Sequence, residues 1–399
     1  MDTPTGTPRH VLILNWRDTR NPEGGGSEVY VERVAEELAD RGHRVTLLCA
    51  AHANGAAEER TERGLTVLRR GSRHTVYLRA ALTYLGGAVG LGRLSRRGLG
   101  RPDVLVDVVN GVPFLSRAYA RRPVVVLVHH VHREQWPVVI GRLRARIGWW
   151  LESRLAVRVY RDCRYVTVSE ATRRELGDLG VDPGRVIVVH NGTPQPPAAA
   201  VAGGAAAAKS AEPTLLVLGR LVPHKRVEIA LHAVARLREA VPGLRLTVAG
   251  TGWWEEHLRA YAEELGIADR VDFAGFVSPE RKQELLTEAW VALTPSLKEG
   301  WGLTIVEAAA AGTPTVAFAS AGGVAEAIVD GETGLLANDE DHFVKLVGDL
   351  LTDGERRQAM GGRARAHARA FTWQESGEKF AVLIAAAVRP AAISSQRVP

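Results

Sequence analysis

The stretch EGWGLTIVE places two carboxylates, Glu299 and Glu307, on either side of a glycine-flanked turn. A strand pattern at 291–296 precedes the turn, and a helical pattern begins near Gly302. The first amides of a helix, here those of about Gly302, Leu303 and Thr304, have no partner within the helix and attract anions. Because Gly300 and Gly302 carry no side chain, a phosphate can approach the backbone closely. The segment therefore predicts an anion site with a carboxylate on each side.

The two glutamates suit different hydroxyl groups of one ligand. Glu307 lies about one turn inside the expected helix, where it can accept hydrogen bonds from a vicinal diol such as a ribose. Glu299 precedes the turn and can hold sugar hydroxyls on the other side of the phosphates. A carboxylate beside a phosphate is costly unless it accepts from hydroxyls or faces a cation. We interpret the pair as a clamp for a nucleotide-activated sugar; the alternative is two solvated acids.

A second anion-binding device follows the strand pattern at 214–220. Arg220 and Lys225 lie five residues apart there, in GRLVPHKR. The chain has 6 lysines and 45 arginines, so composition alone explains this lysine poorly. An ammonium beside a guanidinium suits a diphosphate. The alternative is a pair of surface cations that cap a helix.

Two features of the first half of the chain predict contacts with the same ligand. In NPEGGGSE, Gly25 and Gly26 permit close backbone approach at a helix start, although a flexible turn has the same composition. His129 directly follows the strand pattern at 123–128, with His130 and His132 nearby. No H-E-x-x-H motif or cysteine partner accompanies them, so we expect no metal. We predict that His129 contacts substrate hydroxyls; the alternative is a core histidine.

Strand and helix patterns alternate along both halves of the chain, which predicts an α/β protein with two Rossmann-like, doubly wound parallel-sheet domains. Ligands of such sheets bind beyond the carboxyl ends of the strands, here in the cleft between the domains. We expect an acceptor-binding domain at 1–195, a linker at 196–213 and a nucleotide-sugar domain at 214–375. Residues 376–399 are expected to form a helix that crosses back, followed by a disordered tail.

Composition predicts a cytoplasmic protein, at most peripheral to a membrane. The two cysteines, Cys49 and Cys163, cannot form a disulfide framework, the N-terminus has no apolar signal region, and no apolar run is long enough to span a bilayer. Residues 69–161 contain 18 arginines, no lysine and 4 acids, a net charge of about +14 in a chain of net charge +6. This asymmetry predicts an anionic partner, such as a membrane surface or an acidic acceptor rather than nucleic acid; the alternative is an arginine-rich composition.

One amphipathic segment, 141–161, bears on whether this arginine-rich region binds a membrane. Arginines surround an apolar stripe formed by Leu143, Ile147, Trp150, Leu151 and Leu155. Such a stripe suits a membrane surface, but helices packed on a sheet carry the same pattern. Packing is the interpretation we favour from the sequence, with the arginines facing outward.

Several motifs together resemble the retaining glycosyltransferases of family 4, which have the GT-B fold and an E-x7-E signature. The resemblance covers roughly residues 11–373 and rests on EGWGLTIVE, GRLVPHK, VHNGT, FAGFVS, GGVAEAIVDGETGLL and GGGSEVYVERVAEELADRGHRVTLL. It implies transfer of a sugar from a nucleoside-diphosphate sugar to an acceptor hydroxyl, with retention of the anomeric configuration and without a metal or other cofactor. Cell-envelope polysaccharide, glycolipid and natural-product glycosylation all fit this reaction.

The resemblance also implies roles for particular residues. Glu299 would bind the donor sugar, Glu307 the ribose, and His129 the transferred sugar. The remaining donor contacts would be Arg220 and Lys225 on the diphosphate, Gly25 and Gly26 facing the phosphates, Val277 at the base, and the turn of Gly300, Trp301, Gly302 and Leu303. Catalysis would rest on His129, Glu299, Arg220 and Lys225.

Three positions depart from the family pattern. Trp301 stands where phenylalanine is common, Arg226 replaces a frequent glycine, and His130 stands where many members have aspartate. The last change puts the acid chemistry of that edge, and with it acceptor choice, in question. A GT-B sugar-nucleotide epimerase and a sugar-nucleotide-binding module without turnover are the competing hypotheses. A dehydrogenase is disfavoured because no G-x-G-x-x-G follows a first strand.

Overall fold

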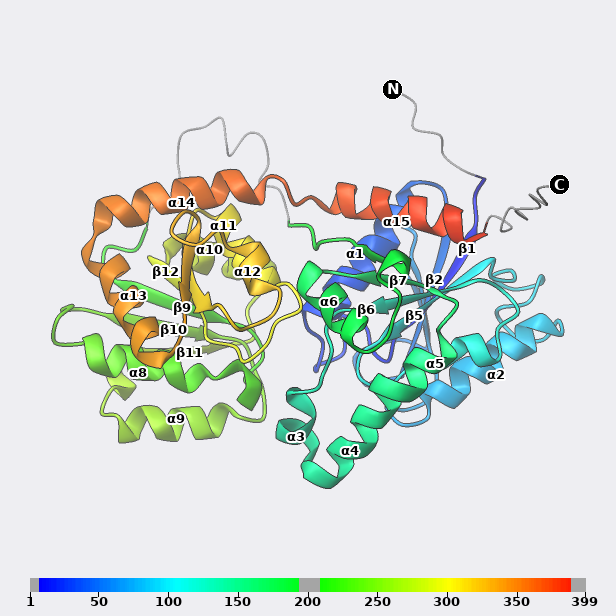
Figure 1. The fold of residues 1–399 in the computed structure, drawn as a ribbon, viewed down its shortest axis with the longest axis horizontal. Coiled ribbons are helices and arrows are strands. Elements are labelled where there is room, and N and C mark those ends of the chain that lie inside the picture. The colour runs from blue at the N-terminus through cyan, green and yellow to red at the C-terminus, as the bar shows by residue number, and fades with distance from the viewer. Residues whose placement is uncertain (1–6, 194–208, 389–399) are drawn as a thin grey trace, which may run out of the picture.

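The computed structural model describes residues 7–193 and 209–388, which fold around two separate β-sheets, each covered by helices (Figure 1). The predicted linker at 196–213 lies outside the described residues as far as 208, and the predicted tail lies outside them from 389 onward. The described end of the linker packs on the second domain, where Lys209 donates to the Ala289 carbonyl oxygen at 2.8 Å.

The first sheet has eight strands in the order β3-β4-β2-β1-β5-β6-β7-β8. All neighbours pair in parallel except β3 and β4, which pair antiparallel at one edge. The sequence patterns did not predict this short edge hairpin. The elements of this half are β1 (His10–Leu14), α1 (Gly26–Asp40), β2 (Arg44–Cys49), β3 (Glu58–Arg60), β4 (Thr66–Arg69), α2 (Val76–Ala88), β5 (Val104–Val109), β6 (Val124–Val128), α3 (Gln135–Ile140), α4 (Arg142–Trp150), a π-helical turn (Leu151–Ala156), α5 (Val157–Val159), β7 (Arg164–Thr167), α6 (Glu170–Asp178) and β8 (Val186–Val188). Short 3-10 turns lie at Ser116–Ala118 and Pro183–Arg185.

The second sheet has six parallel strands in the order β11-β10-β9-β12-β13-β14. Each half therefore has the doubly wound topology that the alternating patterns predicted. The elements of this half are β9 (Thr214–Leu218), α8 (Val227–Leu237), β10 (Arg245–Ala249), α9 (Glu255–Glu264), β11 (Val271–Gly275), α10 (Pro279–Glu288), β12 (Val291–Thr294), α11 (Leu303–Ala310), β13 (Thr315–Phe318), α12 (Val324–Ala327), β14 (Gly334–Ala337), α13 (Glu340–Thr352), α14 (Gly354–Ala368) and α15 (Trp373–Val388), with 3-10 turns at Pro223–Lys225 and Ala268–Arg270.

Apolar periodicity accounts for the core of both halves. The predicted stripe of α1, with Val31, Val34, Ala35 and Leu38, is buried against the first sheet. Continuous runs such as β1 and β6 are buried along their whole length, as strands covered on both faces must be. The chain finally crosses back, because α14 packs on α11 of the second half and α15 packs on α1 of the first (Figure 1).

The apolar stripe of α4 does not pack on the sheet, so the interpretation favoured from the sequence is wrong for this part of the segment 141–161. The side chains of Leu143, Ile147 and Trp150 are 77%, 61% and 54% exposed. The end of the same segment does pack on the first domain, because Ala156 and Tyr160 are buried in the apolar cluster that contains Val124 and Val126 of β6. Among the described residues, no helix is both long and apolar enough to cross a bilayer.

A packed joint connects the two halves beside the E-x7-E segment. The ring of Trp301, only 2% exposed, stacks on His190 with centroids 4.2 Å apart and meets Phe371 edge-on at 5.1 Å. Lys298 forms ion pairs with Glu134 at 3.0 Å and Glu175 at 2.6 Å, both in the first half. The segment that predicts the anion site is therefore also a main contact between the domains.

Trp301→Ala is expected to lower the free energy of unfolding by about 3–5 kcal/mol, because it removes a large buried ring and leaves a cavity in the joint. The matched control is Trp253→Ala, which truncates an indole that is 64% exposed and should change stability little. Denaturant unfolding followed by circular dichroism compares the two variants. Equal losses of stability would contradict the placement of Trp301.

Candidate active site

The predicted site residues of the second half meet at the carboxyl end of its sheet. Beyond β9 and β12, a small hollow is lined by Gly219, Arg220, Lys225, Pro295, Ser296, Glu299 and Thr304, among others. Two of these residues follow β9 directly and others follow β12, and β9 and β12 are neighbours in the sheet. The carboxyl edge of a parallel sheet is where such folds bind ligands.

Glu299 and Lys225 form an ion pair at the centre of this hollow. The Lys225 ammonium lies 2.5 Å from Oε1 of Glu299, and the Ser296 hydroxyl donates to the same oxygen at 2.7 Å. Burial acts to raise the pKa of Glu299, but the charge and hydrogen bond of Lys225, together with the Ser296 bond, outweigh it and lower the pKa below its ordinary value. Glu299 is therefore a fixed anion that neighbours a cation, as a carboxylate near phosphates must be.

The helix start next to this pair has the geometry of an anion site. Gly302 adopts a left-handed conformation, with φ of 91°, as the N-cap of α11. The first intrahelical bond runs from the Ile305 amide to the Gly302 carbonyl at 2.9 Å, so the amides of Leu303 and Thr304 precede it. Gly300 is required for a different reason, since a Cβ there would lie 2.4 Å from the carbonyl oxygen of His129.

The glycine loop of the first half faces the same place from across the domain boundary. A Cβ on Gly25 would lie 3.3 Å from Nε of Arg220, and one on Gly26 would lie 3.7 Å from the Leu303 side chain. Burial is the main cause that lowers the pKa of Arg220, with the nearby Arg17 adding to it. Two predicted devices from opposite halves of the chain are thus brought together at the start of α11.

His129 approaches this region through its backbone. Its ring is buried and meets the Tyr30 ring edge-on at 5.2 Å, and among the described residues Nε2 has no hydrogen-bond partner. Burial lowers the pKa of His129 to about 4, so the imidazole is neutral near pH 7. A contact between this side chain and a transferred sugar stays a prediction.

The other two histidines of that segment belong to a hydrogen-bond network. His130 Nε2 lies 3.0 Å from Gln135, and His132 lies 2.8 Å from Glu152 and 3.1 Å from Asn110. Among the described residues, no group of three or more metal-ligating side chains is gathered in one place.

Glu307 occupies a separate position one turn along α11. Its carboxylate is buried, and Oε1 accepts from Lys282 of α10 at 2.7 Å. Val277 follows β11, just before α10, and packs in a small apolar cluster with Leu218 and Ala274. The expected order of sugar, phosphate and ribose contacts along EGWGLTIVE is therefore compatible with the arrangement of its side chains.

The Trp301 side chain lies in the domain joint, and a donor contact at this residue stays a prediction. The sequence interpretation missed Lys282, which pairs with Glu307, and Lys298, which pairs with acids of the first half. The one available signal was the scarcity of lysine in the chain.

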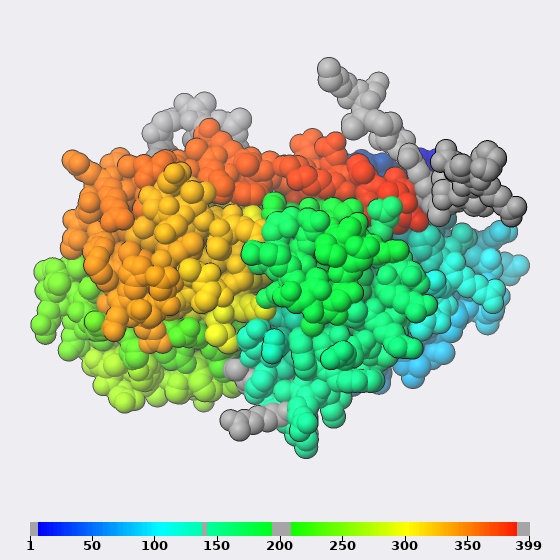
Figure 2. Space-filling view, in the orientation of Figure 1, coloured from blue at the N-terminus to red at the C-terminus, as the bar shows by residue number. Residues whose placement is uncertain are grey.

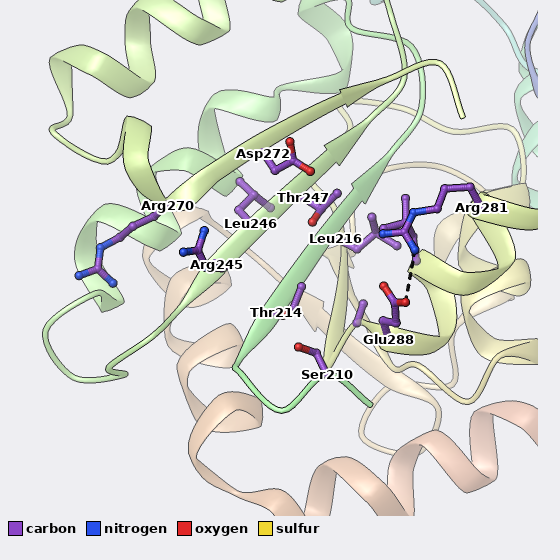
Figure 3. A pocket seen from close by; sticks show the side chains of 12 residues that line it. Ser210, Thr214, Leu216, Arg245, Leu246, Thr247, Arg270, Asp272, Arg281 and Glu288 are labelled. Carbon is purple, nitrogen blue, oxygen red and sulfur yellow. Dashed lines mark hydrogen bonds and ion pairs between the residues drawn. The ribbon is translucent and has the colours of Figure 1, made fainter. Parts of the chain in front are cut away.

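A larger groove, of about 440 Å³, lies elsewhere in the second half (Figure 3). Thr214, Arg245 and Arg270 line it at the amino ends of β9, β10 and β11, on the edge of the sheet opposite the hollow. Arg245 pairs with Glu212 at 3.2 Å, and Arg281 pairs with Glu284 at 2.8 Å. The groove lacks the E-x7-E residues, so it is not the candidate site.

Comparison with known proteins agrees with this geometry. Residues 24–194 match the family described as Glycosyltransferase Family 4, and residues 205–367 match Glycosyl transferases group 1. D-inositol 3-phosphate glycosyltransferase of Acidothermus cellulolyticus is 36% identical over 231 residues, which cover 54% of this chain and 51% of that protein. This alignment thus spans about half the length of the relative.

Two further similarities extend over nearly the whole chain. D-inositol 3-phosphate glycosyltransferase 2 of Catenulispora acidiphila is 29% identical over 402 residues, which cover 92% of each protein. HepE of Anabaena, solved in complex with UDP-glucose, superposes with a TM-score of 0.71 at 18% identity and covers 95% of this chain and 100% of its own. The HepE likeness shows the fold alone.

The two family matches are consecutive and together span most of the described chain, and both sheets have the expected topology. Glu299, the cationic pair and the glycine loop stand where two Rossmann-like domains meet. The chain therefore belongs to family 4 of the glycosyltransferases, with the GT-B fold.

Proposed function

We propose that the protein is a retaining glycosyltransferase that moves a sugar from a nucleoside-diphosphate sugar to an acceptor hydroxyl. The observation that carries this proposal is the convergence of Arg220, Lys225, Glu299 and the start of α11 on one hollow at the domain boundary. Cell-envelope polysaccharide, glycolipid and natural-product glycosylation are the contexts that fit.

The charges of the hollow suit a departing diphosphate. Arg220 and Lys225 supply two cations, and the amides of Leu303 and Thr304 supply oriented dipoles. These groups are held in place before the ligand arrives, so they can stabilise the negative charge that grows on the leaving phosphate without further reorganisation. Neutralisation by side chains and amides is the basis for proposing a reaction without a metal cofactor.

The proposed transfer proceeds on one face of the sugar. The acceptor oxygen forms a bond to the anomeric carbon as the bond to the diphosphate breaks, and the leaving phosphate takes the acceptor proton. Such a reaction needs positioning and charge stabilisation more than a protein base. A buried, neutral His129 and a Glu299 occupied by Lys225 are compatible with that requirement.

Similar proteins support the class of donor. HepE binds UDP-glucose on the same fold, and the curated relatives are named for transfer to inositol 3-phosphate. We propose a nucleoside-diphosphate sugar as donor and a hydroxyl compound as acceptor for this chain.

Lys225→Met is expected to weaken the binding of a nucleoside diphosphate by about 10- to 100-fold, because a charge-assisted hydrogen bond contributes about 1.5–3 kcal/mol. Calorimetric titration with UDP, GDP and ADP measures this effect. The control is Lys345→Met, which removes an exposed lysine paired with Asp349 and should leave binding unchanged. If the unmodified protein binds none of the three nucleotides, or if Lys225→Met binds equally well, the proposal fails. With a sugar donor that is turned over, NMR of the product should show the anomeric configuration of the donor.

We also propose that the protein docks on the anionic, cytoplasmic face of a membrane through its first domain. The exposed stripe of α4 is flanked by the exposed Arg144 and Arg146. A second exposed stripe runs along α2 and beyond it, with Leu78, Leu82, Leu85, Val89 and Leu91. Both helices lie at the margin of the first domain away from α15 (Figure 1), and both stripes are exposed among the side chains that the structure describes.

The chemistry of these two exposed stripes favours contact with lipid. Exposed leucine, isoleucine and tryptophan on one helix face, bordered by arginine, are typical of interfacial helices, and each cation near an anionic membrane contributes about 1 kcal/mol. The space-filling view shows α4 projecting from the body of the first domain (Figure 2). A docked first domain would receive an acceptor from the membrane.

Ile147→Glu is expected to reduce binding to phosphatidylglycerol vesicles by about tenfold or more, since it places a charge within the apolar stripe. The matched control is Val382→Glu on α15, which introduces the same charge at a side chain that is 66% exposed on another surface. Vesicle sedimentation at two salt concentrations measures both effects, and binding should fall as salt rises. Absence of vesicle binding by the unmodified protein, or an equal effect of the control, would refute the docking surface.

A further inference from the structure

Lysine is rare in this chain, and half of its lysines either contact a glutamate of the E-x7-E signature or directly precede it. Of 6 lysines, Lys225 pairs with Glu299 and Lys282 pairs with Glu307, and Lys298 directly precedes Glu299 and pairs with acids of the first domain. Arginine serves nearly everywhere else, with 45 residues. Each signature carboxylate is thus held by the less common cation.

Lysine and arginine hold a carboxylate differently. An ammonium is a compact charge that can bond to one oxygen, whereas the planar guanidinium matches both oxygens at once. At Glu307 the lysine contact is to Oε1, at 2.7 Å. Oε2 of the same carboxylate accepts no hydrogen bond from the described residues, and this oxygen is not fully enclosed by them.

The position of Lys282 is fixed by the start of α10. Ser278 caps this helix, its hydroxyl accepts from the Arg281 amide at 3.2 Å, and Pro279 occupies the first turn. The Lys282 amide donates to the Ser278 carbonyl at 2.8 Å. The lysine therefore stands one turn from Val277 and reaches Glu307 on the neighbouring α11 with its side chain one-third exposed.

We propose that Lys282 is a positioning residue that determines selectivity for the ribose of the donor. It holds Glu307 by Oε1 and leaves Oε2 turned to a vicinal diol, so the site prefers a ribonucleotide to its 2′-deoxy form. This inference rests on the proposed function, because it requires that a nucleoside diphosphate binds along the signature. An arginine at the same position would occupy both carboxylate oxygens and remove the acceptor for the diol.

The test compares nucleotide pairs that differ in one hydroxyl. Dissociation constants of UDP, GDP and ADP and of their 2′-deoxy forms are measured by calorimetry for the unmodified protein and for Lys282→Arg. The unmodified protein should prefer the ribonucleotide by about tenfold or more, the value of a hydrogen bond to a charged group. Lys282→Arg should weaken ribonucleotide binding and reduce the preference to about twofold or less, with little change for the deoxynucleotide.

The control is Lys345→Arg, the same substitution in an exposed lysine–carboxylate pair 2.8 Å long. It should leave both dissociation constants unchanged. Lys282→Met is the second variant, in case the arginine disturbs folding: it removes the bond to Oε1, and the preference should fall there too. Melting temperatures separate a folding defect from a change in selectivity.

The possible outcomes distinguish this inference from the proposed function. If the unmodified protein binds the nucleotides and both Lys282 variants keep its full ribose preference, the role of Lys282 is refuted while the donor site stands. If the unmodified protein binds no nucleoside diphosphate, both proposals fall. A preference lost equally in Lys345→Arg would also refute the role of Lys282.

Discussion

The ion pair between Glu299 and Lys225 is the interaction around which the candidate site is arranged. It joins the loop after β9 to the loop after β12, and its two charges lie 2.5 Å apart in a mostly buried position. Each charge stabilises the other there, because an unpaired charge in a mostly buried position is unfavourable. An arriving diphosphate is the kind of partner that can share the lysine while sugar hydroxyls share the glutamate. The pair thus keeps the site assembled before any donor binds.

The backbone around Glu299 connects this ion pair to the rest of the second domain and to the domain boundary. Its amide donates to the Ala321 carbonyl, and its carbonyl accepts from Gly323, which locks the loop to the start of α12. Its neighbours point in different directions: Lys298 reaches acids of the first domain, Gly300 lies against the His129 carbonyl, and Trp301 fills the joint. A single short segment therefore sets both the donor contacts and the relative placement of the domains. A movement of one domain relative to the other would therefore displace Glu299.

The sequence was informative where a physical pattern has only one common solution. Continuous apolar runs alternating with amphipathic helices predicted both sheets, and a glycine-flanked turn after a strand predicted the helix start near Gly302. The convergence of Arg220, Lys225 and Glu299 followed from parallel strands ending at one edge. By contrast, an amphipathic stripe does not say what covers it, so the exposure of Ile147 could not be predicted. Pairings between separate helices, such as Lys282 with Glu307, depend on the crossing of α10 and α11 and leave no local pattern.

The scarcity of lysine points to a functional role only for those lysines whose ion pairs involve buried groups. Lys345 and Lys379 also belong to the six lysines of the chain, but each forms an exposed pair with an acid one turn away. Arginine forms the same kind of pair elsewhere in this chain. The lysines near the signature differ from these. Lys282 pairs with the buried Glu307, the ammonium of Lys298 is itself buried, and Lys225 pairs with Glu299 in the hollow. At such a carboxylate, the geometry of the cation decides which oxygens stay available. Exposed pairs contribute little to stability, so either lysine or arginine can serve there. At buried carboxylates, replacing a single-point donor by a two-point one changes what else can bind. In this arginine-rich chain, a lysine that pairs with an enclosed acid is therefore a candidate positioning residue.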